Sequence, residues 1–422
     1  MGLGMVAVVG AALAVAPRAR VASAPVRPGL EVLLSDSVHL VRGKRVGLLT
    51  HQGGIDHTGR RGVDRLLGAG IAVRALFSPE HGFRGTADPG APVASTIDSA
   101  TGLPIYSLYG PGAQVSPAML AGLDVLLIDL QDSGARYFTY VAAAVRVLRA
   151  AEAAHLPVVV LDRPNPIGGA VQGNVLDPAR FSSDVGFLAV PMRHGLTFAE
   201  LVLLARHDLG LGAEVHVVPM AGWKRAMYFD ETGLPFVAPS PNLPTLEALI
   251  HYPGLCLFEG TNLSVGRGSP RPFEHLGTPG LAPAAVAARL AALRPPLPGV
   301  RFEVDSFTPV RPGDQKLADT LLAGLRFIVT DRRQYDPTRT ALAVLQQFAN
   351  LPFHQCLDCA DADSLADAAQ FTLQFLPRHF LRLAGDSTAL GWAEAGADPA
   401  ERWRAQREAY LVRRRPFLIY PE

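Results

Sequence analysis

The sequence has few cysteines, few lysines and almost no net charge. Its 422 residues include three cysteines, of which Cys256 lies in an apolar run and Cys356 and Cys359 form a CxxC pair. No second pair of cysteines or nearby pair of histidines completes a zinc ligand set, so we predict no metal site. The 39 basic and 38 acidic residues give a formal net charge of +1. Such a balance lacks the basic surface that nucleic-acid binding needs.

Several well-known catalytic motifs are also absent. The sequence contains no GxSxG, GxxxxGK[ST], HExxH or GxGxxG pattern. Their absence argues against a serine hydrolase, a nucleotide-dependent enzyme and a zinc hydrolase of the helical type. The groups that are left for chemistry are Glu, Asp, His and Tyr, which perform acid–base catalysis without a metal or another cofactor.

One stretch near the N-terminus differs from the rest of the chain. An apolar run from Met5 to Ala16 precedes the small residues Ala22-Ser-Ala24. The run is too short for a stable membrane anchor, and its small-residue ending fits a signal-peptidase site. We therefore predict a signal peptide over residues 1–24 and an exported protein, periplasmic or secreted. A buried first helix is the alternative, because the usual basic start of a signal peptide is missing.

The following 250 or so residues alternate between apolar strands and helices. The predicted strands are Val46–Thr50, Ile71–Phe77, Asp124–Leu130, Pro157–Leu161, Glu214–Pro219 and Leu255–Glu259. The predicted helices are Gly62–Leu67, Tyr140–Ala154 and Thr197–Asp208, the last with a capping box at Thr197-Phe-Ala-Glu200. Near-continuous apolar strands that alternate with helices are typical of a parallel sheet covered on both faces. We predict an α/β domain over residues 25–280.

The pattern changes after Pro279, which indicates a second and smaller α/β domain over residues 281–422. Its predicted elements are the helix Leu281–Leu293, the strands Val300–Phe307 and Leu325–Thr330, and the helices Thr338–Asn350 and Ala400–Arg414. Asp398 and Pro399 fit the N-cap and first position of the last helix.

Four loops that follow predicted strands combine carboxylates, arginines and other polar groups: residues 78–85, 131–140, 162–166 and 259–268. Ligands of open α/β sheets bind outside the carboxyl ends of the strands. Together these loops predict a pocket for a heavily hydroxylated, anionic ligand. Structural ion pairs are the alternative for Asp132 with Arg136 and for Asp162 with Arg163. Arg267 lies between two glycines, which suits recognition of a carboxylate.

The same loops carry an ordered set of motifs that spans residues 29–421. The motifs are Pro79-Glu-His-Gly-Phe-Arg-Gly85, Asp129-Leu-Gln-Asp132, Arg136-Tyr-Phe-Thr-Tyr140, Leu161-Asp-Arg-Pro-Asn-Pro166, Pro191-Met-Arg-His-Gly-Leu-Thr197, Pro239-Ser-Pro-Asn-Leu-Pro244, Glu259-Gly-Thr-Asn262, Gly266-Arg-Gly268, Pro272-Phe-Glu274 and Leu418-Ile-Tyr-Pro421. In this respect the chain resembles the NamZ-type exo-β-N-acetylmuramidases, a family of peptidoglycan-recycling glycosidases. The resemblance implies a Rossmann-like N-terminal domain, a smaller C-terminal domain, and release of N-acetylmuramic acid from the non-reducing end of peptidoglycan fragments.

The resemblance also implies roles for individual residues. Glu80, with His81 beside it, is the expected catalytic acid, and Tyr140 is preferred over Tyr137 as its partner because it stands at the helix entry. A tyrosine nucleophile and a substrate-assisted route both remain open. The residues expected to bind the substrate are Arg84, Gln131, Asp132, Arg136, Arg163, Asn165, Glu259, Asn262, Arg267 and Glu274. We hypothesise that Arg136, Arg163 or Arg267 holds the lactyl carboxylate of muramic acid. A non-catalytic cell-wall binding protein and another hydrolase of sugar derivatives are the alternative functions.

Overall fold

The fold is described from a computed structural model over residues 24–88, 90–110, 112–349, 373–394 and 399–421. The predicted signal peptide lies outside these ranges except for residue 24. The CxxC pair of Cys356 and Cys359 and the predicted N-cap Asp398 also lie outside them.

The central element is a seven-stranded sheet in the order β3-β4-β2-β1-β5-β6-β9. Its strands are β1 (Arg45–Thr50), β2 (Ala72–Ser78), β3 (Thr96–Ile97), β4 (Pro104–Ser107), β5 (Val125–Asp129), β6 (Val158–Leu161) and β9 (Val215–Val218). All neighbouring pairs are parallel except β3 with β4. The six parallel strands therefore have the spatial order 3-2-1-4-5-6 in chain order, which is the Rossmann order. The predicted Rossmann-like N-terminal domain is confirmed.

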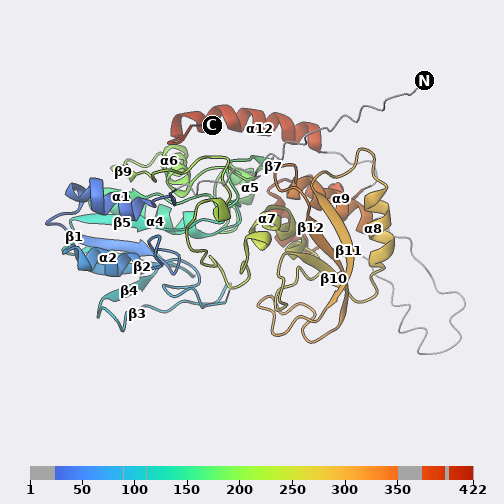
Figure 1. Ribbon diagram of the computed structural model, residues 1–422, viewed down its shortest axis with the longest axis horizontal. Helices are drawn as coiled ribbons and strands as arrows, with labels where there is room; N and C mark the ends of the chain where they lie inside the picture. The colour runs from blue at the N-terminus through green and yellow to red at the C-terminus, as the bar shows by residue number, and fades with distance from the viewer. Residues whose placement is uncertain (1–23, 89, 111, 350–372, 395–398, 422) are drawn as a thin grey trace, which may run out of the picture.

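Helices cover both faces of this sheet (Figure 1). Helices α1 (Gly29–Asp36) and α2 (Gly62–Gly68) pack on one face, where Leu30 and Val63 join Val46 and Leu48 in one buried cluster. Helices α4 (Tyr140–Ala153) and α6 (Phe198–Asp208) pack on the other face. Alternate strand residues thus enter opposite cores, as the period of a strand requires. The capping box predicted at Thr197 is present at the start of α6.

A second sheet of three antiparallel strands has the order β10-β12-β11. Its strands are β10 (His275–Thr278), β11 (Val300–Phe307) and β12 (Leu322–Val329), and α8 (Pro283–Ala291) packs on β11 and β12. Helices α7 (Leu246–Leu255) and α9 (Pro337–Ala349) pack against each other, and α9 also contacts α8. This sheet, on the right of Figure 1, confirms a smaller C-terminal α/β domain. Because β10 belongs to it, the second sheet begins within residues that the sequence analysis assigned to the first domain.

The strand predicted at Leu255–Glu259 is wrong. Helix α7 runs to Leu255, and a 3-10 helix, η3 (Cys256–Gly260), follows it directly. Nearly every residue of this stretch is buried, since it packs on all sides. A continuously apolar run has no period that would separate a buried helix from a buried strand.

Near its end, within the residues 281–422 that were predicted to form the smaller domain, the chain also contacts the first domain. Helix α12 (Ala400–Arg414), red in Figure 1, packs against β7 (Gln172–Val175), which pairs with β8 (Pro191–Arg193). The hydroxyl of Tyr420 then donates to a carboxylate oxygen of Asp162 at 2.7 Å.

The other short elements are η1 (Val38–Leu40), α3 (Pro117–Leu120), α5 (Pro178–Phe181), η2 (Phe229–Glu231), α11 (Pro377–Ala384), η4 (Ala389–Ala393) and η5 (Arg415–Phe417).

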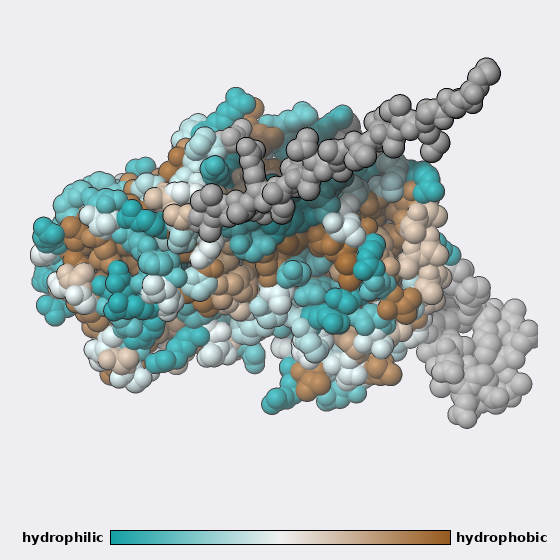
Figure 2. All heavy atoms as spheres, in the orientation of Figure 1, coloured by the Kyte–Doolittle hydropathy of each residue, from teal (hydrophilic) through white to brown (hydrophobic). Residues whose placement is uncertain are grey.

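Hydrophobic residues on the face shown in Figure 2 occur as separate small groups among hydrophilic ones. Within the described residues, no helix has both the length and the apolar character needed to cross a membrane.

Candidate active site

A cavity of about 420 Å³ is lined by loops at the carboxyl end of the parallel sheet and by residues of the second domain. The loops after β2, β4 and β5 form one wall, and residues 256–273, 313–316 and 376–379 form the wall that faces it. The polar and ionisable residues of the lining are Glu80, His81, Tyr109, Tyr137, Thr139, Asp184, Ser240, Asn242, Tyr252, Cys256, Glu259, Arg267, Asp314, Lys316 and His379. The position matches the ligand-binding edge of other open α/β sheets.

Glu80 is the carboxylate of the sheet-side wall, two residues after the end of β2. The hydroxyl of Thr139 donates to one of its carboxylate oxygens at 2.6 Å, and the backbone N–H of Gly90 donates to the other at 2.9 Å. The residue is 8% exposed. The two donors come from different loops, so they fix the carboxylate in one orientation at the cavity surface.

His81 follows Glu80 with a left-handed backbone (φ 67°). Its Nδ1 donates to the carbonyl of Ala87 at 2.8 Å, since a carbonyl can only accept. Burial lowers the pKa of His81, against the opposing effect of the Glu80 charge. A neutral imidazole with its proton on Nδ1 leaves Nε2 as an acceptor.

Tyr109 is the second ionisable group beside Glu80. It follows β4 and lines the same wall. Burial raises the pKa of Tyr109, and the neighbouring Glu80 carboxylate adds to that rise. The phenol is therefore protonated at neutral pH and can donate a hydrogen bond.

The facing wall holds an ion pair between Glu259 and Arg267. The Nε of Arg267 donates to a carboxylate oxygen of Glu259, and its guanidinium carbon lies 5.2 Å from the centre of the Phe273 ring. Burial opposes ionisation of Glu259, but Arg267 outweighs it and holds the pKa of this carboxyl below its ordinary value. The pair is therefore ionised in the cavity wall.

The two glycines beside Arg267 are required by close contacts. Gly266 and Gly268 both have positive φ, at 79° and 78°. A Cβ on Gly266 would lie 2.4 Å from the His275 ring, and one on Gly268 would lie 2.6 Å from the carbonyl oxygen of Val310. Only glycine fits both positions, which explains the Gly-Arg-Gly motif by packing as well as by backbone conformation.

Two family models match consecutive parts of the chain. The family model described as "Exo-beta-N-acetylmuramidase NamZ, N-terminal" matches residues 46–247, and its C-terminal counterpart matches residues 250–420. The chain belongs to the NamZ family. A curated relative, the peptidoglycan beta-N-acetylmuramidase NamZ of Bacillus subtilis, is 42% identical over 328 residues, which are 77% of this chain and 78% of the relative.

Two solved structures from Bacteroides fragilis share the NamZ fold seen here. Both are described as DUF1343 family proteins. One superposes with a TM-score of 0.81 at 30% identity and covers 94% of this chain and 99% of its own. The other has a TM-score of 0.72 at 29% identity and covers 94% and 100%.

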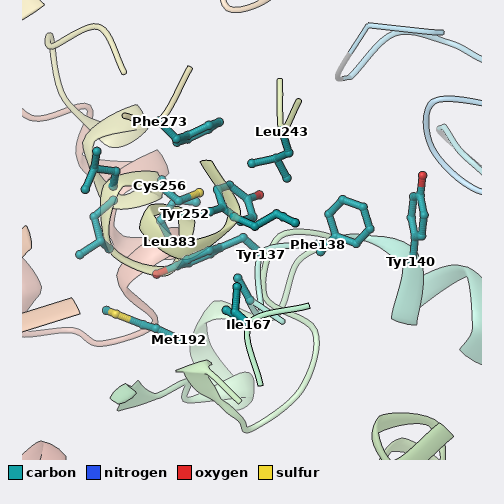
Figure 3. Packing of buried hydrophobic residues seen from close by; sticks show 14 of the residues in the cluster. Tyr137, Phe138, Tyr140, Ile167, Met192, Leu243, Tyr252, Cys256, Phe273 and Leu383 are labelled. Carbon is teal, nitrogen blue, oxygen red and sulfur yellow. The ribbon is translucent and has the colours of Figure 1, made fainter. Parts of the chain in front are cut away.

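Of the residues that the NamZ resemblance implied, five line the cavity: Glu80, His81, Tyr137, Glu259 and Arg267. Of the two candidate tyrosines, Tyr137 lines the cavity and the preferred Tyr140 does not. The hydroxyl of Tyr140 donates to the carbonyl of Pro239 at 3.1 Å, and its ring lies outside the cavity lining. Figure 3 shows Tyr137 gathered with Tyr252 and Cys256, whereas Tyr140 lies apart, beyond Phe138.

Two of the three candidate arginines have structural partners away from the cavity. The guanidinium of Arg163 donates to Asp129 at 2.9 Å, so its partner is not Asp162, the neighbour considered from the sequence. Arg136 donates to the carbonyls of Leu383 and Ala384 at 2.7 and 2.8 Å. Both arginines are buried and outside the lining. Arg267 is therefore the candidate that the structure leaves for the lactyl carboxylate.

The amide and carboxylate groups of the β5 and β6 loops also bind within the protein. The side chain of Gln131 donates to the carbonyl of Asp132 at 2.9 Å, and Asn165 donates to that of Leu196 at 2.8 Å. The carboxylate of Asp132 lies 3.0 Å from Nε2 of His194. These contacts hold the loops together behind the cavity, so the expectation that they bind substrate directly is not supported.

Three further residues expected to bind substrate lie outside the cavity lining: Arg84, Asn262 and Glu274. Arg84 pairs with Asp98 at 3.2 Å. The side-chain oxygen of Asn262 accepts from the backbone of Gln374 at 3.0 Å, and Glu274 accepts from Thr245 at 3.1 Å. In the described ranges, no group of three or more His, Cys, Asp or Glu side chains is placed to bind a metal ion.

The structure adds lining residues that the sequence analysis missed. Asn242 lies in a proline-rich motif of the family resemblance, which was a usable signal. Tyr109 follows a strand that was not predicted, because β4 has four residues and begins with proline. Asp184, Lys316 and His379 come from irregular segments or a short helix, where periodicity gives no indication of position.

Proposed function

We propose that this protein is an exo-acting glycosidase that releases N-acetylmuramic acid from the non-reducing end of peptidoglycan fragments. Membership of the NamZ family and the similarity to the peptidoglycan beta-N-acetylmuramidase of Bacillus subtilis support this proposal. The observation that carries it is the Glu80 carboxylate, which is fixed by Thr139 and Gly90 at the surface of a cavity that Arg267 and Lys316 also line. A single cavity of this kind suits one terminal sugar with an anionic substituent.

Glu80 acts in this proposal as the general acid. It gives its proton to the glycosidic oxygen as the bond from that oxygen to the anomeric carbon breaks, and positive charge develops on the sugar ring. The neutral phenol of Tyr109 lies beside Glu80 and donates a hydrogen bond to the Glu80 carboxylate that the proton transfer leaves. Glu80, as a carboxylate after the transfer, regains a proton from the water that completes hydrolysis.

A second group must support the anomeric centre. Burial raises the pKa of Tyr137, so this tyrosine is a neutral phenol rather than an anionic nucleophile. We therefore assign the supporting role to the 2-acetamido group of the sugar, whose carbonyl oxygen bonds to the anomeric carbon as the leaving oxygen departs. Water then cleaves that bond. Because these groups suffice, the proposed route uses no metal, and a chelator should leave the rate unchanged.

The test compares a chromogenic β-N-acetylmuramide with the matching glucosaminide, using wild-type protein and the Glu80→Gln variant. We expect turnover of the muramide and a fall in kcat of at least about 100-fold in Glu80→Gln, the scale of general acid catalysis. Glutamine keeps the shape and can still accept from Gly90. Full activity of a folded Glu80→Gln protein would remove Glu80 from the mechanism. Absence of turnover of either sugar, together with tight binding of the muramide, would favour a cell-wall binding protein.

A further inference from the structure

Lys316, on the wall that faces Glu80, has no carboxylate partner. Its ammonium nitrogen donates to the carbonyl oxygens of Glu259 and Thr261, at 2.6 and 2.7 Å. Across the described residues, no acidic side chain lies within ion-pair distance of it. An ammonium group has three N–H donors, and the two carbonyls use two of them. The charge and the third donor are thus left for the cavity that Lys316 lines.

The backbone on both sides of Lys316 has a conformation that is unfavourable for residues other than glycine. Lys316 lies in the connection between β11 and β12, residues 308–321. Gln315 and Leu317, on either side of it, both have left-handed backbones, with φ values of 57° and 52°. Non-glycine residues keep this conformation only where their surroundings impose it, and such residues concentrate at ligand-binding positions. The N–H of Val310 bonds to the carbonyl of Gly268 at 2.9 Å, which ties the connection to the loop of Arg267.

Arg267 offers unused donors in the same wall. Its Nε is taken by Glu259, but its two terminal nitrogens have no hydrogen-bond partner among the residues that the structure describes. The guanidinium is held in place by that carboxylate and by its contact with the Phe273 ring. An oriented guanidinium with free terminal N–H groups matches the planar geometry of a carboxylate.

The acidic groups nearby have direct partners other than the ammonium of Lys316. Glu259 is engaged by Arg267, and the Asp314 carboxylate accepts the backbone N–H of Lys316 at 3.2 Å rather than its ammonium. His379 lines the same wall, and burial lowers its pKa, so it adds no fixed charge at neutral pH. Burial lowers the pKa of Lys316 despite the charges of Asp314 and Glu259, and its direct hydrogen-bond partners are neutral carbonyls. An anionic ligand would offset the cost of burying this ammonium.

We propose that Lys316 and Arg267 together form a carboxylate subsite, and that Lys316 determines specificity by binding the lactyl carboxylate of the terminal sugar. This inference rests on the proposed function, because it names the part of the substrate that this wall recognises. The carboxylate accepts from a terminal nitrogen of Arg267 and from the third N–H of Lys316. Glu259 acts as a positioning residue for Arg267.

The experiment compares two chromogenic muramides that differ only in the lactyl group, one with the free carboxylate and one with the neutral carboxamide. Lys316→Gln is the informative variant, because its amide keeps two N–H donors for the two carbonyls but removes the charge. Wild-type protein should prefer the carboxylate. In Lys316→Gln the ratio of the two kcat/KM values should fall by roughly 10-fold to 100-fold, the range of one charge-assisted hydrogen bond, through KM rather than kcat.

Two control variants separate recognition from structure. Lys316→Arg keeps the charge and should keep most of the preference for the carboxylate. Arg271→Gln removes an exposed cation outside the cavity lining and should keep the wild-type ratio. A general electrostatic effect of the protein charge would lower the ratio in Arg271→Gln as well, and would overturn the proposal.

Different results would contradict the carboxylate subsite and the proposed muramidase function. An unchanged ratio in a folded Lys316→Gln protein overturns the carboxylate subsite while leaving the muramidase activity intact. If wild-type protein cleaves neither substrate, the proposed function fails, and calorimetric binding of N-acetylmuramic acid and its lactyl amide then decides the subsite by itself. Equal affinity of the wild type for both sugars would overturn it.

Discussion

The two walls of the cavity are built in different ways. The sheet-side wall carries Glu80 and Tyr109 two residues after parallel strands and Thr139 at the start of α4, where regular hydrogen bonding fixes the neighbouring backbone. The facing wall carries Arg267 and Lys316 on irregular segments. Gly266 and Gly268, beside Arg267, pack closely against their neighbours, and Gln315 and Leu317, beside Lys316, have left-handed backbones. A rigid edge suits proton transfer, which depends on the position of one atom. In the proposed function, the irregular wall binds the substituent that distinguishes the terminal sugar from related sugars.

The comparison also separates arginines that look alike in sequence. Arg163 and Arg267 both lie in polar loops that were expected to follow strands, next to carboxylates or glycines. The first is paired with Asp129 at the base of the sheet loops, and the second faces the cavity. The partner of an arginine, rather than its motif, therefore decides whether its guanidinium is available to a ligand.

The largest expected effect is a loss of stability when Arg163 is replaced. Arg163→Met should lower the free energy of unfolding by about 3–5 kcal/mol, because it leaves the buried carboxylate of Asp129 without its counter-charge. Thermal and denaturant unfolding measure this change. The muramide KM of the folded fraction should stay close to that of the wild type. A raised KM at wild-type stability would show that Arg163 binds substrate after all.

Arg267 should give the opposite result. Arg267→Met should raise the KM for the muramide by roughly 10-fold to 100-fold, because a charged hydrogen bond to the substrate is lost. It also leaves Glu259 unpaired, so the double variant with Glu259→Gln should recover stability without recovering KM. Steady-state kinetics and melting curves of the three proteins test this. Recovery of KM in the double variant would mean that the ion pair only supports the fold.

Thr139 tests the sheet-side wall. Thr139→Val removes the hydroxyl that donates to Glu80 at 2.6 Å while keeping the side-chain shape. We expect kcat to fall about 10-fold with KM unchanged, since the acid loses its orientation but the substrate loses no contact. Thr139→Ser should restore most of the rate. A change in KM alone would place Thr139 in substrate binding.

The last expected effect, on the pH dependence of stability, concerns Asp162, behind the cavity. Burial raises the pKa of Asp162 to about 7, against hydrogen bonds from the Ala199 backbone and the Tyr420 hydroxyl. Between an unfolded pKa near 4 and the folded value, the folded protein binds a proton that the unfolded chain does not. This contribution to stability is therefore present at low pH and is lost as the pH rises from about 4 to about 7.

Asp162→Asn provides the matched control for this pH dependence, because asparagine keeps an acceptor for the backbone N–H groups and cannot titrate. Relative to this variant, wild-type protein should lose stability across that pH interval, as measured by denaturant unfolding at several pH values. A wild-type curve parallel to that of the variant would show that Asp162 does not carry the proton.

Much of the fold could be predicted from the sequence, because parallel strands and amphipathic helices leave a period. The strands that begin near Val46 and Val125 were located to within two residues, and the capping box at Thr197 marked the start of α6. The run Leu255–Glu259 was misassigned because burial on all sides removes that period. The return of Tyr420 to Asp162 is a long-range contact without a local pattern.

The site was predictable only in part. The position of Glu80 after a strand led correctly to the cavity, and so did the glycines around Arg267. The choice between Tyr137 and Tyr140 depended on side-chain direction at a helix start, which the sequence does not contain. Lys316 lies in an irregular connection, and its role depends on two carbonyl contacts that only the folded structure displays.

The exo-acting muramidase activity is tested by the products formed from a peptide-free peptidoglycan strand with N-acetylmuramic acid at its non-reducing end. We expect wild-type protein to release one molecule of N-acetylmuramic acid per strand and then to stop at the newly exposed N-acetylglucosamine. Glu80→Gln should release none at the same enzyme concentration. Internal fragments would contradict the exo-acting mode. Continued release of N-acetylglucosamine would contradict the recognition of muramic acid by the facing wall.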